Sequence, residues 1–294
     1  MAITKHIDIS KFGKGALEKP LSRKDYRLEV LAKSSKLQSE YIIEYKGKIK
    51  NQGDSSSCVG QALSYYASLL NFMETGNWTE LSARFIYSKI FQPEGGAYID
   101  DGLKVLMNDG IGLEEDVPSY ENGKEPSEKF MRKHDDISYG ESETAKQFLI
   151  KKYFTWENTN VEWYKQAIVQ GHGSPAISWG NNILWSLEDI VLPDNRNQMA
   201  WLHCILFVGW SDKKKAFKII NSWDDWGDKG FGWLPYSYVE KGYVTNPKTM
   251  IDVPNDTYVK LTSQVKNLSE MVRLFQIIIN LKNKIVQLLK GRVN

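Results

Sequence analysis

Residues 50–70 read Lys-Asn-Gln-Gly-Asp-Ser-Ser-Ser-Cys-Val-Gly-Gln-Ala-Leu-Ser-Tyr-Tyr-Ala-Ser-Leu-Leu. A loop rich in Gly and Ser runs directly into a helical segment, and Cys58 lies at the junction. The partial positive charge of a helix N-terminus stabilises a thiolate, which is the nucleophilic form of cysteine. Gln52 lies earlier in the same loop, which can fold back and present the amide to the sulfur. The stretch predicts a cysteine nucleophile with an amide donor for an oxyanion.

The whole chain has the composition of a soluble globular protein. Its 294 residues are 41% apolar and 25% charged, and the formal net charge of +2 gives no general attraction to nucleic acid. The two cysteines, Cys58 and Cys204, exclude a disulfide framework and favour a reducing compartment. We find no apolar signal segment at the N-terminus and no run of eighteen apolar residues.

The hydrophobic pattern changes character along the chain. From Cys58 the apolar residues follow helical spacing, and Gly76 ends the predicted helix, which we expect to be central and buried. Further helices are predicted at 81–91, 101–108, 127–133, 143–151 and 161–170, and strands at 175–179, 203–210, 216–223 and 258–261. A helical first half followed by a strand-rich second half predicts an α+β protein with two lobes.

Both terminal segments differ from the central part of the chain. We expect residues 1–45 to form an extension that lies on the surface of the protein. A short inhibitory or docking arm is the alternative. Residues 263–294 form a basic amphipathic pattern, in which seven apolar residues share one helical face: Met271, Leu274, Phe275, Ile278, Leu281, Ile285 and Leu288. We expect this helix to mediate a homo-oligomer or contact a partner protein. Docking on its own domain and contact with a membrane surface are the alternatives.

A general base is predicted at the start of the most apolar strand. His203 opens the strand 203–210, so its imidazole can reach a cleft while the following residues hold the strand in the core. A hairpin places Asn221 of the next strand near the level of His203. An imidazole that acts as a base needs its second nitrogen held by an acceptor, which an Asn carbonyl provides without adding charge. Trp223 can cover this hydrogen bond from water and strengthen it.

Taken together, these motifs resemble the papain-like cysteine peptidases. The matching residues are Lys-Asn-Gln52-Gly before Cys58, Gly95-Gly96 followed by Leu103 and Gly110-Ile111, His203 at the start of a Val-Gly strand, Asn221-Ser-Trp223, Trp226-Gly227 and Gly230-Phe231-Gly232. The resemblance implies a two-lobed papain-like fold over residues 46–262, with the active site in the cleft. The segment before it is similar to that of prokaryotic or phage members, so we expect a cytoplasmic or virion-associated protein.

The resemblance implies a role for each catalytic residue. Cys58 is the nucleophile, His203 the general base and acid, and Asn221 the residue that orients the imidazole. Gln52 and the backbone N–H of Cys58 form the oxyanion hole, in which one donor supplies about 3–4 kcal/mol of transition-state stabilisation. The expected reaction is hydrolysis of peptide bonds in a polypeptide substrate through an acyl-enzyme, with no metal and no cofactor.

The substrate contacts are expected elsewhere along the cleft. Gly95 and Gly96 pair with an extended substrate backbone, because a turn without side chains permits close approach. Ile177 and Leu202 form an apolar specificity wall, and Trp223 also lies at the substrate.

Three questions are left open by the sequence. Cys204 is expected to be a buried inert thiol, because strand alternation points it away from the cleft, with a redox partner of Cys58 as the alternative. The rival function is a catalytically idle papain-fold binding or assembly module that works through residues 263–294. An acyl transferase that uses the same residues is a third possibility.

Overall fold

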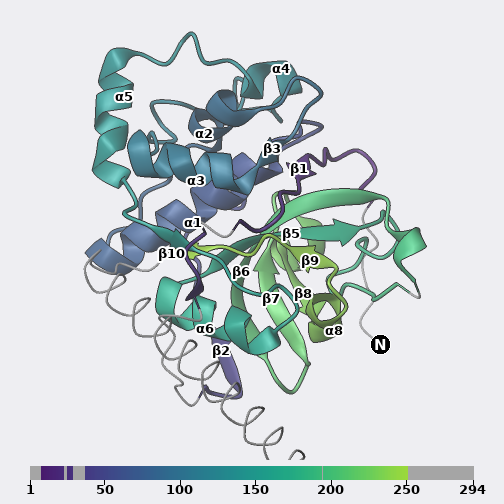
Figure 1. Cartoon of the computed structure of the whole chain (residues 1–294). Coiled ribbons are helices and arrows are strands. Elements are labelled where there is room, and N and C mark those ends of the chain that lie inside the picture. The colour runs from purple at the N-terminus through teal and green to yellow at the C-terminus, as the bar shows by residue number, and fades with distance from the viewer. Residues whose placement is uncertain (1–7, 23–24, 29–36, 194, 251–294) are drawn as a thin grey trace, which may run out of the picture. The chain divides into compact units, whose positions relative to one another are not determined.

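The computed structural model describes residues 8–22, 25–28, 37–193 and 195–250 (Figure 1). The chain divides into two compact units, residues 1–28 with 34–252, and residues 29–33 with 253–294. The second unit lies outside the described residues, and so do the predicted strand 258–261 and the predicted helix 263–294. None of the described helices combines the length and the apolar character needed to cross a membrane.

The first half of the chain forms the helical lobe. Its helices are α1 (Cys58–Thr75), α2 (Ala83–Ile90), α3 (Ile99–Asn108), α4 (Glu128–Met131) and α5 (Tyr139–Ala145), followed by the 3₁₀ turn η2 (Lys146–Phe148). Gly76 ends α1 with a left-handed φ of 74°, which a glycine adopts without strain. Helices lie at the predicted positions 58–76, 81–91, 101–108, 127–133 and 161–170, but the helix predicted at 143–151 ends at Ala145, and residues 149–151 are not helical. Residues 139–145 become helical earlier than expected because Ser138 and Glu141 form a capping box.

The second half forms a six-stranded antiparallel sheet. The strand order is β8 (Phe231–Pro235), β7 (Ala216–Ile220), β6 (Trp201–Ser211), β5 (Ser174–Gly180) and β9 (Val244–Thr245), and β2 (Glu40–Ile42) pairs with the end of β6. Helices α6 (Val161–Gly171), α7 (Trp226–Lys229) and α8 (Tyr236–Glu240) and the 3₁₀ turn η3 (Arg196–Gln198) complete this lobe. The expected α+β fold class is confirmed, although the sequence pattern did not predict β8 or β9.

Two short strand pairs connect distant segments. β1 (Ala16–Leu17) pairs in parallel with β3 (Ala97–Tyr98), which directly precedes α3. β10 (Thr249–Met250) pairs with β4 (Tyr153–Phe154). The first pair brings the N-terminal segment to the helical lobe.

The central helix α1 contacts α2 and α3 on one side and β6 on the other (Figure 1). Its first twelve residues are all buried, which fits the expectation of a buried central helix. Gly60 permits the close approach of α2, since a Cβ there would lie 2.7 Å from the carbonyl oxygen of Ala83. α1 therefore fixes Cys58, its first residue, against the strand that carries His203.

Candidate active site

His203 of β6 meets Asn221, the residue directly after β7. The Nε2 atom of His203 lies 2.7 Å from Oδ1 of Asn221, and the backbone N–H of Ser222 donates to the same oxygen over 2.7 Å. The Ser222 N–H identifies this atom as the amide oxygen, which can only accept hydrogen bonds. Nε2 of a neutral His203 therefore carries the ring proton, and Nδ1 is left as the basic nitrogen.

Trp223 covers this hydrogen bond, as the sequence predicted. Its ring lies 4.3 Å from that of His203, centroid to centroid, with an interplanar angle of 31°, and the indole is fully buried. A buried hydrogen bond without competition from water is electrostatically stronger than an exposed one. The imidazole is thereby held in one orientation.

Cys58 is the first residue of α1, and its thiol lies next to β6. The backbone of Cys204, the residue after His203, is near enough to the Cys58 thiol to lower its pKa. The Nδ1 atom of His203 has no hydrogen-bond partner among the described residues, so the thiol and the imidazole are not hydrogen bonded to each other in this state. Both side chains are 0% exposed.

Gln52 is held by the loop that follows Asn221. The carboxamide oxygen of Gln52 accepts a hydrogen bond of 2.6 Å from Oγ of Ser222, and its backbone N–H donates to the Ser222 carbonyl oxygen over 2.9 Å. The Nε2 group of Gln52 donates to the carbonyl oxygens of Ser55, at 2.7 Å, and Gly13, at 3.0 Å. The predicted oxyanion donor is therefore oriented by Ser222 and is already bonded to carbonyl oxygens of this chain.

The N-terminal segment, residues 8–19, explains why the side chains of Cys58 and His203 are buried. The ring of Phe12 stacks on that of Trp223, with centroids 5.7 Å apart and an interplanar angle of 5°. The backbone N–H of Gly13 donates to the carbonyl oxygen of Gly53, and the Gly15 backbone is near enough to the Cys58 thiol to lower its pKa. This segment thus lies directly over the thiol and the imidazole.

Burial under this segment favours the neutral forms of Cys58 and His203. Burial raises the pKa of the Cys58 thiol to about 11, and the nearby backbones of Cys204 and Gly15 oppose this rise. Burial lowers the pKa of His203 to about 3, its hydrogen bond with Asn221 opposes this, and the nearby Lys14 ammonium adds to the lowering. The helix N-terminus was expected to favour a thiolate. In the covered site desolvation is the larger effect, because it penalises the charged form of each group.

The Gly95–Gly96 turn lies against the same N-terminal segment. Both glycines have left-handed φ angles, of 98° and 79°. A Cβ on Gly96 would come within 2.2 Å of the Gly15 carbonyl oxygen, which accepts a hydrogen bond of 2.7 Å from the N–H of Ala97. The edge at which an extended backbone was expected to bind is thus occupied by residues 15–17.

The two predicted specificity residues lie on the sheet. In the register of β5 with β6, Ile177 pairs with Cys204 and Leu202 pairs with Trp179, so Ile177 and Leu202 share the Cys204 face. Ile177 is fully buried and Leu202 is half-buried. Their role toward a substrate stays a prediction.

Cys204 is a free, buried thiol. Burial raises its pKa, and the neighbouring Cys58 raises it further. Its buried, protonated state agrees with the expectation of an inert thiol. The interaction with Cys58 places Cys204 closer to the nucleophile than strand alternation alone predicted.

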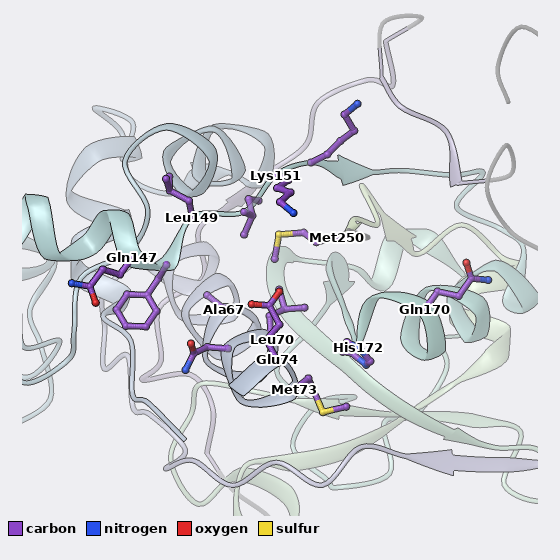
Figure 2. Close-up of a pocket in the computed structure, with 14 residues that line it drawn as sticks. Ala67, Leu70, Met73, Glu74, Gln147, Leu149, Lys151, Gln170, His172 and Met250 are labelled. Atoms are coloured by element: carbon purple, nitrogen blue, oxygen red, sulfur yellow. The ribbon is translucent and has the colours of Figure 1, made fainter. Parts of the chain in front are cut away.

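The cavity of about 640 Å³ in Figure 2 lies away from this site. It is bordered by the C-terminal part of α1, by residues 147–152 and by the end of α6, with Met250 on one side (Figure 2). None of its lining residues belongs to the predicted catalytic set. The candidate active site is therefore defined by the hydrogen bonds of His203, Asn221, Gln52 and Ser222, and not by this cavity.

Sequence reasoning missed several residues of the site. These are Phe12, Gly13, Lys14 and Gly15 of the cover, Ser222 behind Gln52, and the indoles of Trp185 and Trp201 beside His203. One available signal was the Gly-Lys-Gly sequence of residues 13–15, since a segment that packs on another backbone needs residues without side chains.

No protein-family model matches the chain. Its sequence is similar to an uncharacterized peptidase C1-like protein of Acanthamoeba polyphaga mimivirus, with 26% identity over 209 residues. The match covers 64% of this chain, and the chain spans 64% of the length of that relative.

Solved structures with a similar fold are cysteine proteases. Xylellain from Xylella fastidiosa gives a TM-score of 0.70 at 22% identity, covering 86% of this chain and 100% of that one. The cysteine protease and lectin-like domains of Cwp84 from Clostridium difficile give 0.65 at 18% identity, covering 83% and 56%. Digestive procathepsin L 3 of Tenebrio molitor gives 0.59 at 15% identity, covering 82% and 76%. By its fold, this chain is therefore papain-like, as the resemblance of its motifs implied.

Proposed function

We propose that this chain is a cysteine peptidase that hydrolyses peptide bonds in polypeptide substrates, and that residues 8–19 keep it latent. The observation that carries the proposal is the hydrogen bond between His203 and Asn221. It fixes the imidazole and leaves Nδ1 without a hydrogen-bond partner among the described residues, on the strand that contacts Cys58. The sequence relative is a peptidase C1-like protein, and one structural neighbour is a procathepsin.

The proposed reaction starts once the N-terminal segment has left the site. Nδ1 of His203 takes the thiol proton, and the Cys58 thiolate attacks the substrate carbonyl carbon. The Nε2 group of Gln52 and the backbone N–H of Cys58 stabilise the oxyanion. The imidazolium then protonates the leaving amine as the C–N bond breaks, which leaves a thioester on Cys58.

Hydrolysis of the thioester completes the cycle. His203 takes a proton from water, the resulting hydroxide attacks the thioester carbonyl, and the thiolate leaves and recovers the proton from the imidazolium. Asn221 contributes by keeping Nε2 protonated and the ring in place. No step requires a group beyond the side chains of this chain and water.

Latency follows from the contacts of the N-terminal segment. Residues 12–16 occupy the oxyanion donor, the Cys58 thiol and the edge of β3 at the same time. A substrate backbone needs the same groups, so it can bind only after the segment is displaced. A latent enzyme and an idle binding module predict different results once this segment is displaced, because only the latent enzyme then cuts peptides.

The test uses the full chain and a substitution that displaces the cover. A Cβ on Gly15 would lie 2.3 Å from the Ser56 carbonyl oxygen, so Gly15→Ala forces the segment away, whereas a Cβ on Gly140 meets only one atom, at 3.8 Å. We expect Gly15→Ala to accelerate alkylation of Cys58 and to cut a mixture of unfolded polypeptides, with new termini identified by mass spectrometry. Gly140→Ala behaves as the wild type.

Cysteine substitutions identify the nucleophile. In the Gly15→Ala chain, Cys58→Ala abolishes cleavage, whereas Cys204→Ala retains it. Cleavage that survives Cys58→Ala contradicts the peptidase assignment. An opened chain whose Cys58 is alkylated but which cuts no peptide supports the idle binding module, and a product that forms only with an added amine supports an acyl transferase.

A further inference from the structure

The ammonium group of Lys14 lies over the rings of two indoles that pack against each other. Its Nζ atom is 5.6 Å from the ring centroid of Trp201 and 5.4 Å from that of Trp223. Both distances are within the range of about 6 Å for cation–π attraction. Nζ also donates a hydrogen bond of 2.7 Å to the carbonyl oxygen of Ile9. The Asp8 carboxylate also attracts this ammonium and raises its pKa, so the two indoles and Asp8 are its charge partners.

The two indoles are held in place by other residues of the sheet lobe. Trp201 and Trp223 pack edge to face, with centroids 5.7 Å apart and an interplanar angle of 84°. Trp185 packs edge to face against both, at 5.4 Å and 6.1 Å. The indole N–H of Trp201 donates to the side-chain oxygen of Asn182 over 2.9 Å. The two indole rings are therefore held in place by Trp185, Asn182 and each other, and not by Lys14.

The position of these indoles beside His203 shows which part of a substrate they would meet. Trp201 lies 6.2 Å and Trp223 4.3 Å from the imidazole, centroid to centroid. In the proposed reaction His203 must protonate the leaving amine, so the residue that follows the scissile bond lies on the His203 side of the thiol. A side chain from that residue is the one that can reach over the two rings, where Lys14 Nζ lies.

We propose that Trp201 and Trp223 form a cation clamp for a lysine or arginine side chain on the substrate residue directly after the scissile bond, and that Lys14 fills this clamp in the closed chain. This specificity rests on the proposed peptidase function. It assigns to Trp201 a role that the sequence motifs did not suggest.

The charge of the bound side chain determines how the preference is expressed. Half-burial lowers the pKa of Lys14 to about 8, so the group is still mostly protonated at pH 7. The ammonium also disfavours a charged imidazole, because it lowers the pKa of His203. A cation in the clamp therefore improves substrate binding but does not stabilise the imidazolium form of His203. We expect the preference to appear as a lower KM and not as a higher kcat.

The test compares peptides that differ only after the scissile bond. Lysine, Nε-acetyllysine, norleucine and glutamate are placed there, and the full chain carrying Gly15→Ala is the enzyme. We expect kcat/KM for lysine to exceed that for norleucine by about threefold to thirtyfold, with acetyllysine close to norleucine. Mass spectrometry confirms that the intended bond is cut.

Substitutions of Trp201 show whether the rings cause this preference. The lysine-to-norleucine ratio is expected to fall in Trp201→Phe and to approach one in Trp201→Leu. The ratio does not depend on the fraction of folded enzyme, so partial misfolding leaves it unchanged. A ratio below twofold in the Gly15→Ala chain, or a ratio that Trp201→Leu leaves unchanged, overturns the proposal.

A second measurement reads the clamp without any peptide cleavage. In the full chain with Gly15 intact, Lys14→Met and Trp201→Leu should each accelerate Cys58 alkylation, and the double variant should be no faster than either one. Lys14→Arg should stay slow. If no peptide is cut, the peptidase proposal fails, but the comparison of the single and double variants still tests whether Lys14 occupies the clamp. Non-additive effects of Lys14→Met and Trp201→Leu support this occupancy, and independent effects overturn the clamp.

Discussion

The carboxamide nitrogen of Gln52 donates a hydrogen bond of 3.0 Å to the carbonyl oxygen of Gly13. Gln52 lies in the loop that leads into α1, whose first residue is Cys58. A backbone carbonyl of the chain itself thus takes the donor that the proposed reaction needs for the oxyanion. The oxygen of the same carboxamide is fixed by Ser222 over 2.6 Å. In the proposed function Gln52 therefore has two roles, holding the cover when closed and stabilising the oxyanion when open.

The catalytic role of Gln52 can be separated from its role in closure. In the Gly15→Ala chain, Gln52→Ala should lower kcat by about 10²–10³-fold and leave KM almost unchanged, because the lost hydrogen bond acts on the transition state. Peptide hydrolysis is measured alongside iodoacetamide alkylation, which forms no oxyanion and should not slow. A kcat within about threefold of the parent contradicts the assignment of Gln52 as an oxyanion donor.

Glu18 attaches the end of the N-terminal segment to the sheet lobe. Its carboxylate accepts hydrogen bonds from the indole N–H of Trp179 at 3.0 Å and from the hydroxyl of Thr245 at 2.6 Å. These contacts are exposed, so removing them should cost about 1 kcal/mol of closure. We expect Glu18→Ala to accelerate Cys58 alkylation about fivefold.

A neighbouring residue provides the control for Glu18. Lys19 contributes only its backbone carbonyl oxygen, which accepts a hydrogen bond of 2.9 Å from Asn246. Lys19→Ala should therefore leave the alkylation rate unchanged. Equal acceleration by both substitutions would show that general loosening of the segment, and not the Glu18 carboxylate, limits opening.

The sequence predicted the site because its chemistry is local to identifiable motifs. Cys58 lies where a Ser-rich loop meets a helical pattern, and His203 lies near the start of β6, as its third residue. A short turn joins β6 to β7, which Asn221 directly follows. Each of these placements follows from periodicity and turn chemistry over ten to twenty residues. For this reason the helix at Cys58 and the contact of His203 with Asn221 were both predictable.

The cover was not predictable in the same way. Residues 8–19 carry little regular structure, and only the two residues of β1 join a strand pair. Their position depends on contacts with residues far away in the chain, such as Phe12 with Trp223. Local periodicity contains no information on such pairings. The burial of Cys58, and with it the raised thiol pKa, could therefore be known only from the structure.

Closure should weaken in acid because of His203. Burial lowers its pKa to about 3 from the ordinary value of 6.5, so the closed state disfavours the protonated imidazole. A group whose pKa is lowered by closure contributes stability above its ordinary pKa and loses it as the pH falls toward the lowered value. The relevant window runs from about pH 6.5 to pH 3. Lys14 and Asp8, which lie on the cover, do not reverse this sign in that window.

Hydrogen exchange measures this opening without cleavage. The N–H of Ala97, bonded to the Gly15 carbonyl oxygen, should lose protection between pH 6.5 and pH 4, after correction for the intrinsic exchange rate. His203→Gln removes the titrating group and should abolish this pH dependence. Protection that is constant over the window, or a loss that persists in His203→Gln, contradicts the role of His203.

Lys248 and Asp100 form a buried ion pair that fastens the segment before β10 to α3 of the helical lobe. The Nζ atom of Lys248 lies 2.9 Å from Oδ1 of Asp100, and the two side chains are 1% and 9% exposed. Removing one partner of such a pair leaves an uncompensated buried charge. We expect Lys248→Met to lower the free energy of unfolding by about 3–5 kcal/mol, measured by urea denaturation.

An exposed pair on the same helix α3 supplies the matched control. Lys104 lies 2.7 Å from Asp101, with 55% and 34% exposed side chains, so Lys104→Met should change stability by less than about 1 kcal/mol. The double variant Lys248→Met with Asp100→Leu should recover most of the loss, because no charge then stays buried. If Lys248→Met costs no more than Lys104→Met, the buried pair does not stabilise the junction between α3 and β10.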